Sequence, residues 1–145
     1  MSSIHVKKLS PNAILPTYGS AEAAGADLYA CLEEAVTVEP GQTAWIPTGI
    51  AMEVPKGCAG LVYARSGMAC KRGLAPANKV GVVDSDYRGE ILVALYNHGE
   101  VSQTVEHGER IAQFVITPVL TPVYETAEEL TDTARNTGGF GSTGK

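Results

Sequence analysis

The stretch Arg65-Ser66-Gly67 combines three residue types that suit a phosphate group. An Arg side chain can bind phosphate through two parallel hydrogen bonds, a Ser hydroxyl can donate another, and Gly lets the backbone approach closely. The stretch opens "SGMACKRG", which is a candidate for a short helix. A plain turn with a surface Arg would use the same residues, so the stretch alone indicates little.

Two Asp residues stand where a loop could hold a carboxylate for chemistry. Asp84 directly follows the apolar pair Val82-Val83, and a rigidly held carboxylate can act as a general base on water. Asp27 lies among small residues in "AAGADLYA" and gains interest only near a metal-bound polyphosphate, because Mg²⁺ keeps its waters and takes carboxylates. Asp is also common in turns for local hydrogen bonding, which remains the alternative for both residues and for Asp86.

The last residues contain a second phosphate-like pattern. Residues 139–145 fit the first seven positions of a P-loop, G-x-x-x-x-G-K. In this sequence, however, no Ser or Thr follows Lys145 to hold magnesium, and no helix follows to face the phosphates. Residues 131–145 are also rich in glycine and poor in apolar residues, so we expect a mobile lid rather than a P-loop. Phe140 and Arg135 argue against a tail without a function.

Together these side chains suit one kind of ligand, a magnesium-bound polyphosphate that carries a base and a sugar. Gln113 joins them from the strand-like "GERIAQFVI", where a buried amide must find partners. In this hypothesis the carboxylates of Asp27 and Asp84 handle metal and water, and Phe140 and Tyr87 supply aromatic faces. The phosphate donors are Arg65, Ser66, Arg135, Ser142 and Thr143.

Short strands separated by frequent turns must position these residues. Turn signals recur in "VEPGQ", "EVPKG", "YNHGE" and "EHGER". Residues 44–54 place their large apolar side chains on one parity, as a half-buried strand would, and "EILVALY" and "AQFVITPVL" are also strand-like. "NKVGVVDSDYRGEI" predicts a β-hairpin with carboxylates near its tip, and "ETAEELTD" is a second candidate for a short helix. Such spacing of strands and turns predicts a sandwich or a closed barrel.

Composition narrows the class of protein. A chain of 145 residues with 44% hydrophobic residues can form one globular domain. A net charge of −5 and a pI near 5.1 argue against a nonspecific nucleic-acid binder. The three Cys and three His residues are scattered, which favours reduced thiols in a cytosolic protein and gives no zinc motif. We find neither a signal peptide nor an apolar run of membrane-spanning length.

Five stretches, in this order and at this spacing, closely resemble the motifs of the homotrimeric dUTPases: "AGADLYA", "ARSGMA", "NKVGVVDSDYRGE", "GERIAQF" and "RNTGGFGSTG". The resemblance covers nearly the whole chain. It implies an all-β fold, a jelly-roll-like β-barrel of the dUTPase β-clip type over residues 1–130, with one short helix and a flexible C-terminal arm over residues 131–145. It also implies a homotrimer whose active sites are shared between subunits.

The resemblance further implies hydrolysis of dUTP to dUMP and pyrophosphate with Mg²⁺, in the cytoplasm or, in a eukaryote, also in the nucleus. This reaction limits uracil in DNA and supplies dUMP for dTTP synthesis. Asp84 matches the catalytic Asp, and Asp27 matches the Asp that reaches the metal through water. Tyr87 matches the Tyr that packs under the deoxyribose and leaves no room for a 2′-hydroxyl.

The remaining implied contacts are with the base and the phosphates. Those that read uracil are Asn78 and the backbone of Gly81, Val82 and Val83. Those that hold phosphates are Arg65, Ser66, Gly67 and Gln113. In the arm, Phe140 would cover the uracil ring. The arm residues implied to contact the nucleotide are Arg135, Phe140, Gly141, Ser142 and Thr143.

The chain departs from the motifs only mildly, and two alternatives stay open. Ala64 stands where many relatives have Pro, and "VVD" replaces the more usual "ID". A dCTP deaminase has a similar fold but needs an acid/base group at the cytosine amine, and we find no second suitable carboxylate outside "DSDY". A non-catalytic dUTP-binding regulator should lack a reactive residue, whereas Asp84, Arg65 and the whole arm are present.

Overall fold

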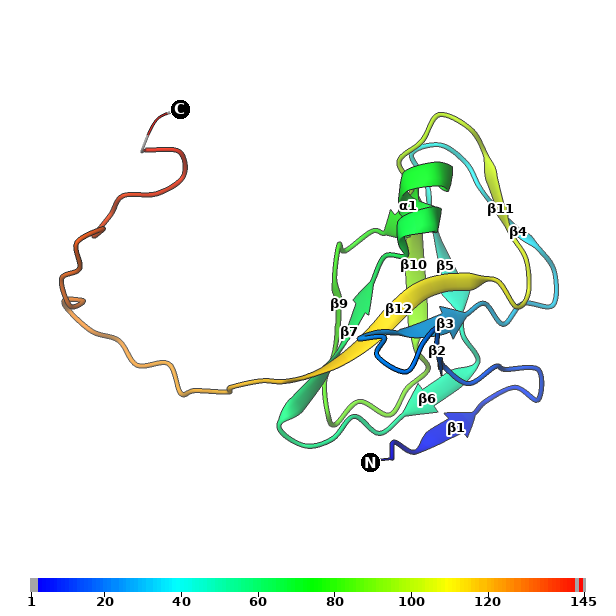
Figure 1. Ribbon diagram of the computed structural model, residues 1–145, viewed down its shortest axis with the longest axis horizontal. Coiled ribbons are helices and arrows are strands. Elements are labelled where there is room, and N and C mark those ends of the chain that lie inside the picture. Colours follow the sequence, from blue (N-terminus) through cyan, green and yellow to red (C-terminus); the bar gives the residue numbers. More distant parts are fainter. Residues whose placement is uncertain (1–2, 143, 145) are drawn as a thin grey trace.

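Twelve strands and one helix make up the regular structure of residues 3–142 and Gly144, which the computed structural model describes (Figure 1). In chain order they are β1 (Val6–Lys8), β2 (Thr17–Tyr18), β3 (Ala26–Tyr29), β4 (Val36–Val38), β5 (Thr43–Pro47), β6 (Ile50–Met52), β7 (Cys58–Tyr63), α1 (Ser66–Arg72), β8 (Leu74–Pro76), β9 (Gly81–Val83), β10 (Leu92–Asn97), β11 (Gln103–Val105) and β12 (Arg110–Pro118).

The strands form four small antiparallel sheets. The largest has the order β2-β3-β12-β7-β9, a second has the order β5-β10-β8, and two further pairs join β1 to β6 and β11 to β4. Most neighbours within a sheet are distant in sequence, so the chain crosses repeatedly between sheets. The predicted all-β class with one short helix is confirmed, and α1 occupies the first of the two helix candidates.

One apolar core lies between the sheets. The strands supply most of its fully buried side chains, the largest of which are Leu28, Ile46, Ile50, Leu74, Leu95 and Ile111. The longest strand, β12, lies between β3 and β7. A side chain at Gly60 on β7 would collide with the ring of Phe114 on β12, so glycine is required for this pair of strands to pack.

The prediction of one half-buried strand over residues 44–54 is wrong. β5 ends at Pro47 and pairs with β10, whereas β6 begins at Ile50 and pairs with β1. The break is at Gly49, whose φ of +67° favours glycine and whose missing Cβ leaves room for the Cys31 sulfur. The alternation nevertheless predicts which large side chains face the core, since Ile46, Ile50 and residues 52 and 54 are buried.

Two further expectations are also wrong. β9 pairs with β7 and β10 pairs with β5 and β8, so "NKVGVVDSDYRGEI" joins two sheets instead of forming a hairpin. Residues 125–132 form no helix. A segment this short needs tertiary packing to be helical, and its apolar Leu130 is almost fully exposed.

After β12 the chain leaves the body of the protein. Residues 119–142 contain no strand or helix, and beyond Val119, whose N–H donates to the Gly57 carbonyl, they extend well away from the sheets (Figure 1). This departure starts before Thr131, where the sequence places the arm. Over the described part of the chain, no helix has the length and apolar character needed to cross a membrane.

Candidate active site

Arg65, Ser66 and Gly67 lie together at the start of α1. Arg65 occupies the N-cap position with extended backbone angles, and its side chain makes no capping hydrogen bond. Ser66 and Gly67 are exposed, and a Cβ added at Gly67 would meet nothing within 4 Å. Packing within the chain therefore does not require glycine here. An open approach to the first turn of a helix suits an anionic group.

A buried carboxylate orients the Arg65 side chain. Asp27, on β3, is only 5% exposed, and its Oδ1 accepts a hydrogen bond of 2.8 Å from Arg65 Nε. Its Oδ2 lies 3.5 Å from Arg110 Nη1, and Arg65 Nη1 also donates to the Arg110 carbonyl at 3.5 Å. A buried charge must be compensated, and here two guanidinium groups flank one carboxylate. The result is a cationic cluster with one Asp at its centre.

The register of β12 brings Gln113 to this cluster. Gln113 pairs with Asp27 on β3 and with Tyr63 on β7, and directly paired residues project to the same face of a sheet. Arg65 follows Tyr63 by two residues. The structure therefore gathers Asp27, Arg65 and Gln113 from three separate stretches of sequence.

Sequence reasoning missed Arg110 as part of this cluster. It lines a hollow of ≈ 320 Å³ whose walls are Arg65, Gly67, Met68, Arg72, Gly108, Glu109 and Arg110. Arg110 lies three residues before Gln113, in a stretch already singled out. The register shift between Arg110 and Ala112 explains the miss, because strict alternation does not hold across this irregularity.

The residues expected to read a base surround a different hollow, of ≈ 200 Å³. Asn78, residues 81–83 and Tyr87 line it, together with Trp45 and part of β10. β9 is the last strand of its sheet, so one edge of its backbone carries no ladder within the described residues. Such an edge offers N–H donors and C=O acceptors to a flat ligand.

Asp84 lies at the end of β9, in the loop that leads to β10. It is exposed, and its carbonyl accepts the Tyr87 N–H at 3.2 Å, which closes a turn. No hydrogen bond or ion pair found within the described part of the chain involves its carboxylate. The side chain is therefore available to act on a ligand or on water.

The same loop is held by neighbouring side chains. Tyr87 Oη donates to the Glu90 carbonyl at 3.1 Å, and Gly89 leaves the space that the ring occupies. Arg88 Nη1 donates to the carbonyls of Ser85 and Tyr87, at 2.8 and 2.9 Å. Arg88 also approaches Glu53. A hydrogen bond with His5 lowers the pKa of the Glu53 carboxyl below its ordinary value, and the charge of Arg88 acts in the same direction.

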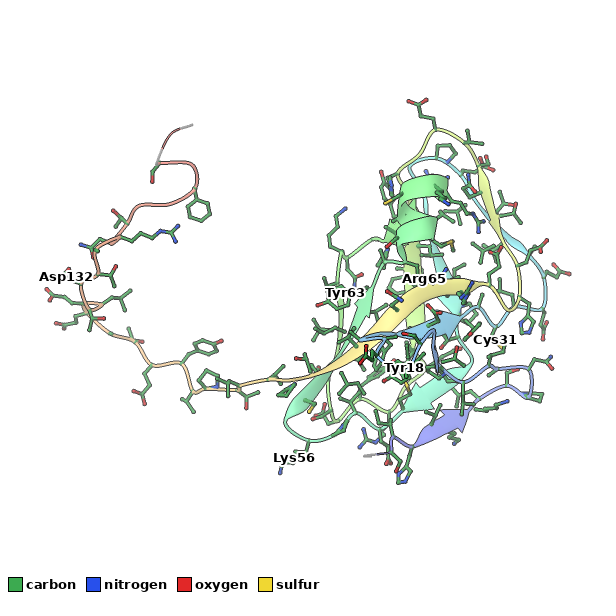
Figure 2. All side chains as sticks on the ribbon, viewed as in Figure 1. Tyr18, Cys31, Lys56, Tyr63, Arg65 and Asp132 are labelled. Carbon is green, nitrogen blue, oxygen red and sulfur yellow. The ribbon has the colours of Figure 1, made fainter. Side chains whose placement is uncertain are left out.

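The expected arm residues lie far from both hollows. Asp132 lies well away from Arg65 in Figure 2, and Phe140 is fully exposed. The hydrogen bonds found over residues 133–142 are all local, including Arg135 Nε to the Gly138 carbonyl at 2.5 Å and Gly139 N–H to Ser142 Oγ at 2.7 Å. Gly141, with a φ of +85°, lies in a turn of the same segment. Thr143 and Lys145 lie outside the described residues.

The predicted site residues thus fall into three groups that lie apart from one another within a single chain. The cationic cluster and the β9 hollow share no lining residue, and the arm touches neither. Among the described residues, no three His, Cys, Asp or Glu side chains are grouped so that they could hold a metal ion. Asp27 is a single carboxylate between two Arg residues. This arrangement suits an incoming anion that brings its own cation better than a resident metal.

Comparison with known proteins adds independent information on the family and the fold. The family model described as dUTPase matches residues 11–144. The deoxyuridine 5′-triphosphate nucleotidohydrolase of Syntrophotalea carbinolica is 50% identical over 142 residues, which is 98% of this chain and 97% of the relative. That of Desulfitobacterium hafniense is 54% identical over 131 residues, 90% of this chain and 87% of the relative. A solved structure of a Staphylococcus bacteriophage 80alpha dUTPase G164S mutant with dUpNHpp superposes with a TM-score of 0.91 and 31% identity, and the match covers all of both chains.

Proposed function

The chain belongs to the dUTPase family, and from this premise we propose that it hydrolyses dUTP to dUMP and pyrophosphate. The proposal rests on one observation: the chain carries both a cationic cluster around Arg65 and an exposed strand edge at β9, beside Asp84 and Tyr87. The first suits a triphosphate and the second a pyrimidine. The reaction keeps dUTP low, limits uracil in DNA and supplies dUMP for dTTP synthesis. We place it in the cytoplasm, and in a eukaryote also in the nucleus.

Product analysis tests the proposal directly. The purified chain is incubated with dUTP, dCTP, dTTP, dATP, dGTP or UTP in the presence of Mg²⁺, and pyrophosphate and ammonia are both measured. Pyrophosphate from dUTP alone supports the proposal. Ammonia from dCTP would instead indicate a deaminase, and tight dUTP binding without any product would indicate a regulator.

The base is read by backbone groups of β9. Uracil presents two carbonyl acceptors that flank one N–H donor, and the free edge of residues 81–83 carries groups of both kinds. Asn78 adds a side-chain amide beside Gly81, where its Nδ2 lies 3.4 Å from the position of an added Cβ. We expect the 5-methyl group of dTTP to be rejected, because the segment from Asn78 to Val83, rather than Tyr87, faces that edge of the base.

The phosphates are held by the cationic cluster. Arg65, Ser66 and Gly67 supply a guanidinium, a hydroxyl and open backbone, while Gln113 supplies an amide. Mg²⁺ bound to the triphosphate would neutralise part of its charge. Since both oxygens of Asp27 face Arg side chains, we propose that Asp27 reaches this metal only through water.

Replacing Tyr87 by Ala should relax the rejection of ribonucleotides. We propose that the ring, held by the Oη bond to Glu90, occupies the space that a 2′-hydroxyl would need. Removal of the ring should reduce discrimination between dUTP and UTP by about 1–3 kcal/mol, as expected for a packed pocket. The ratio of kcat/KM for the two nucleotides measures this effect. Tyr87→Phe is the control, since it keeps the ring and should keep the preference. An unchanged ratio in Tyr87→Ala would assign discrimination to other residues.

We propose that three chains form one trimer and that each active site is shared between chains. Separate hollows and a remote arm in one chain support this proposal, because the proposed substrate must contact all three groups at once.

A mixing experiment tests the sharing. Asp84→Asn chains are refolded together with chains that end at Thr133, and the trimers are verified by mass. Each parent should be almost inactive, while hybrids should regain activity, because one chain supplies the intact Asp84 and another supplies the intact arm. Asp84→Asn chains mixed with chains that carry both defects are the control and should regain nothing. Hybrid trimers without recovery would argue against shared sites.

A further inference from the structure

Helix α1 carries the start of the phosphate cluster but has little to hold it in place. It spans seven residues and buries only Met68 in the core. A helix of this length is marginal by itself, so tertiary contacts must fix its direction. Gly73, with a φ of +69°, ends the helix beside the backbone of Gly99, and its carbonyl accepts the His98 N–H at 2.8 Å. This contact fixes one end of the helix but does not fix its orientation.

The Arg72 side chain supplies the missing connection. Its Nε donates to Gln103 Oε1 at 3.1 Å, and its Nη2 donates to the Thr104 carbonyl at 2.6 Å. Its Nη1 lies 3.3 Å from both carboxylate oxygens of Glu109 and 3.5 Å from the sulfur of Met68. One planar guanidinium thus joins α1 to β11 and to the turn that precedes β12.

That turn leads directly into the second cation of the cluster. Glu109 precedes Arg110, its carbonyl accepts the Ala30 N–H at 2.8 Å, and its carboxylate accepts the Glu106 N–H at 3.3 Å. Arg72 therefore ties the helix that begins beside Arg65 to the segment that supplies Arg110. All three Arg residues line the same hollow. Each of the three guanidinium nitrogens of Arg72 already has a partner within the chain, whereas a residue that binds phosphate directly needs free donors.

We infer that Arg72 is a positioning residue that sets the spacing between Arg65 and Arg110 and thereby the affinity for the outer phosphates. The inference rests on the proposed function. It assigns Arg72 no contact with the base or the sugar. Loss of Arg72 should therefore weaken pyrophosphate and dUTP far more than dUMP, which lacks the outer phosphates.

Arg72→Gln and Arg72→Lys test the inference. A Lys ammonium keeps the charge but cannot span acceptors on β11 and on the turn at once. In both variants KM for dUTP and the inhibition constant of pyrophosphate should rise about 10- to 100-fold, a size typical of misplaced binding groups, while kcat and dUMP affinity change little. Lys56→Gln, which removes an exposed charge elsewhere, is the control and should match the natural chain.

A double variant separates positioning from general loosening. Glu109→Gln should reproduce the effect, and combining it with Arg72→Gln should add little, since both act through one contact. Unchanged pyrophosphate inhibition in a folded Arg72→Lys chain would overturn the inference. Equal losses for dUMP and pyrophosphate, or fully additive losses, would also overturn it. The binding assays need no turnover, so a natural chain that fails to hydrolyse dUTP would refute the proposed reaction separately.

Discussion

The Asp84→Asn variant should hydrolyse dUTP about 10²–10⁴-fold more slowly than the natural chain, as is typical when a general base is lost. Attack on the α-phosphorus needs an oriented water, and the Asp84 carboxylate stands free at the end of β9 to accept its proton. Asn keeps the shape of the side chain but cannot act as a base. Substrate binding should be largely retained, because we propose that the base and the phosphates contact other residues.

Steady-state pyrophosphate release and equilibrium binding of dUTP together measure this effect. Asp86→Asn is the matched control, since it removes an equal charge from the same exposed loop two residues away. We expect it to retain turnover close to that of the natural chain. Near-normal turnover in Asp84→Asn, or equal losses in the two variants, would show that Asp84 is not the base.

Local sequence patterns predicted the strands β10 and β12 but not how the strands pair. The parity of residues 44–54 identified the core side chains Ile46, Ile50 and Met52, because alternation follows from the backbone of each strand, although Ala51 on the other parity is buried as well. It could not reveal that the chain changes sheets at Gly49. That change depends on Cys31 and on strand β1, which lie far away in sequence, so a window around residues 44–54 does not contain the information.

The loop after β9 departs from the predicted hairpin for a similar reason. Two apolar strands separated by Asp, Tyr and Gly usually indicate a hairpin, but β9 finds its partner in β7. The consequence matters for function. A hairpin would have paired β9 with the next strand of the chain, whereas the observed edge leaves backbone groups of residues 81–83 open beside Tyr87.

The cationic cluster could be foreseen only in part. Arg65, Asp27 and Gln113 come from stretches with recognisable motifs, but their contact depends on the register of β12 against two strands. Arg110 lies in "GERIAQF" and Arg72 in "SGMACKRG", but neither stretch by itself assigns these two residues a role. Their importance follows from which carboxylates they meet in three dimensions, Asp27 and Glu109, and no spacing rule along the chain predicts those pairs.

A chain that ends at Thr133 should fold and assemble but turn over dUTP far more slowly. We propose that the missing residues close over the bound nucleotide, with Phe140 on the uracil ring and with Arg135 and Ser142 at the phosphates. Their hydrogen bonds in the free chain are local, so their removal should leave the free energy of unfolding of the body unchanged. Closure excludes water, and its ordering entropy is offset only when base and triphosphate are both present.

Lys145→Ala distinguishes this lid from a true P-loop, in which the Lys would be indispensable for binding phosphate. Lys145 lies outside the described residues, and residues 119–142 before it contain no strand that could build the rigid strand-loop-helix frame of a P-loop. We expect kcat/KM of the Lys145→Ala chain to stay close to that of the natural chain. The Phe140→Ala chain should lose much of the turnover that the truncated chain loses. Thermal unfolding and the number of subunits per particle must be unchanged in all three variants for the comparison to count. A Lys145→Ala chain as inactive as the truncated chain, beside an active Phe140→Ala chain, would refute the lid and restore the phosphate-loop interpretation.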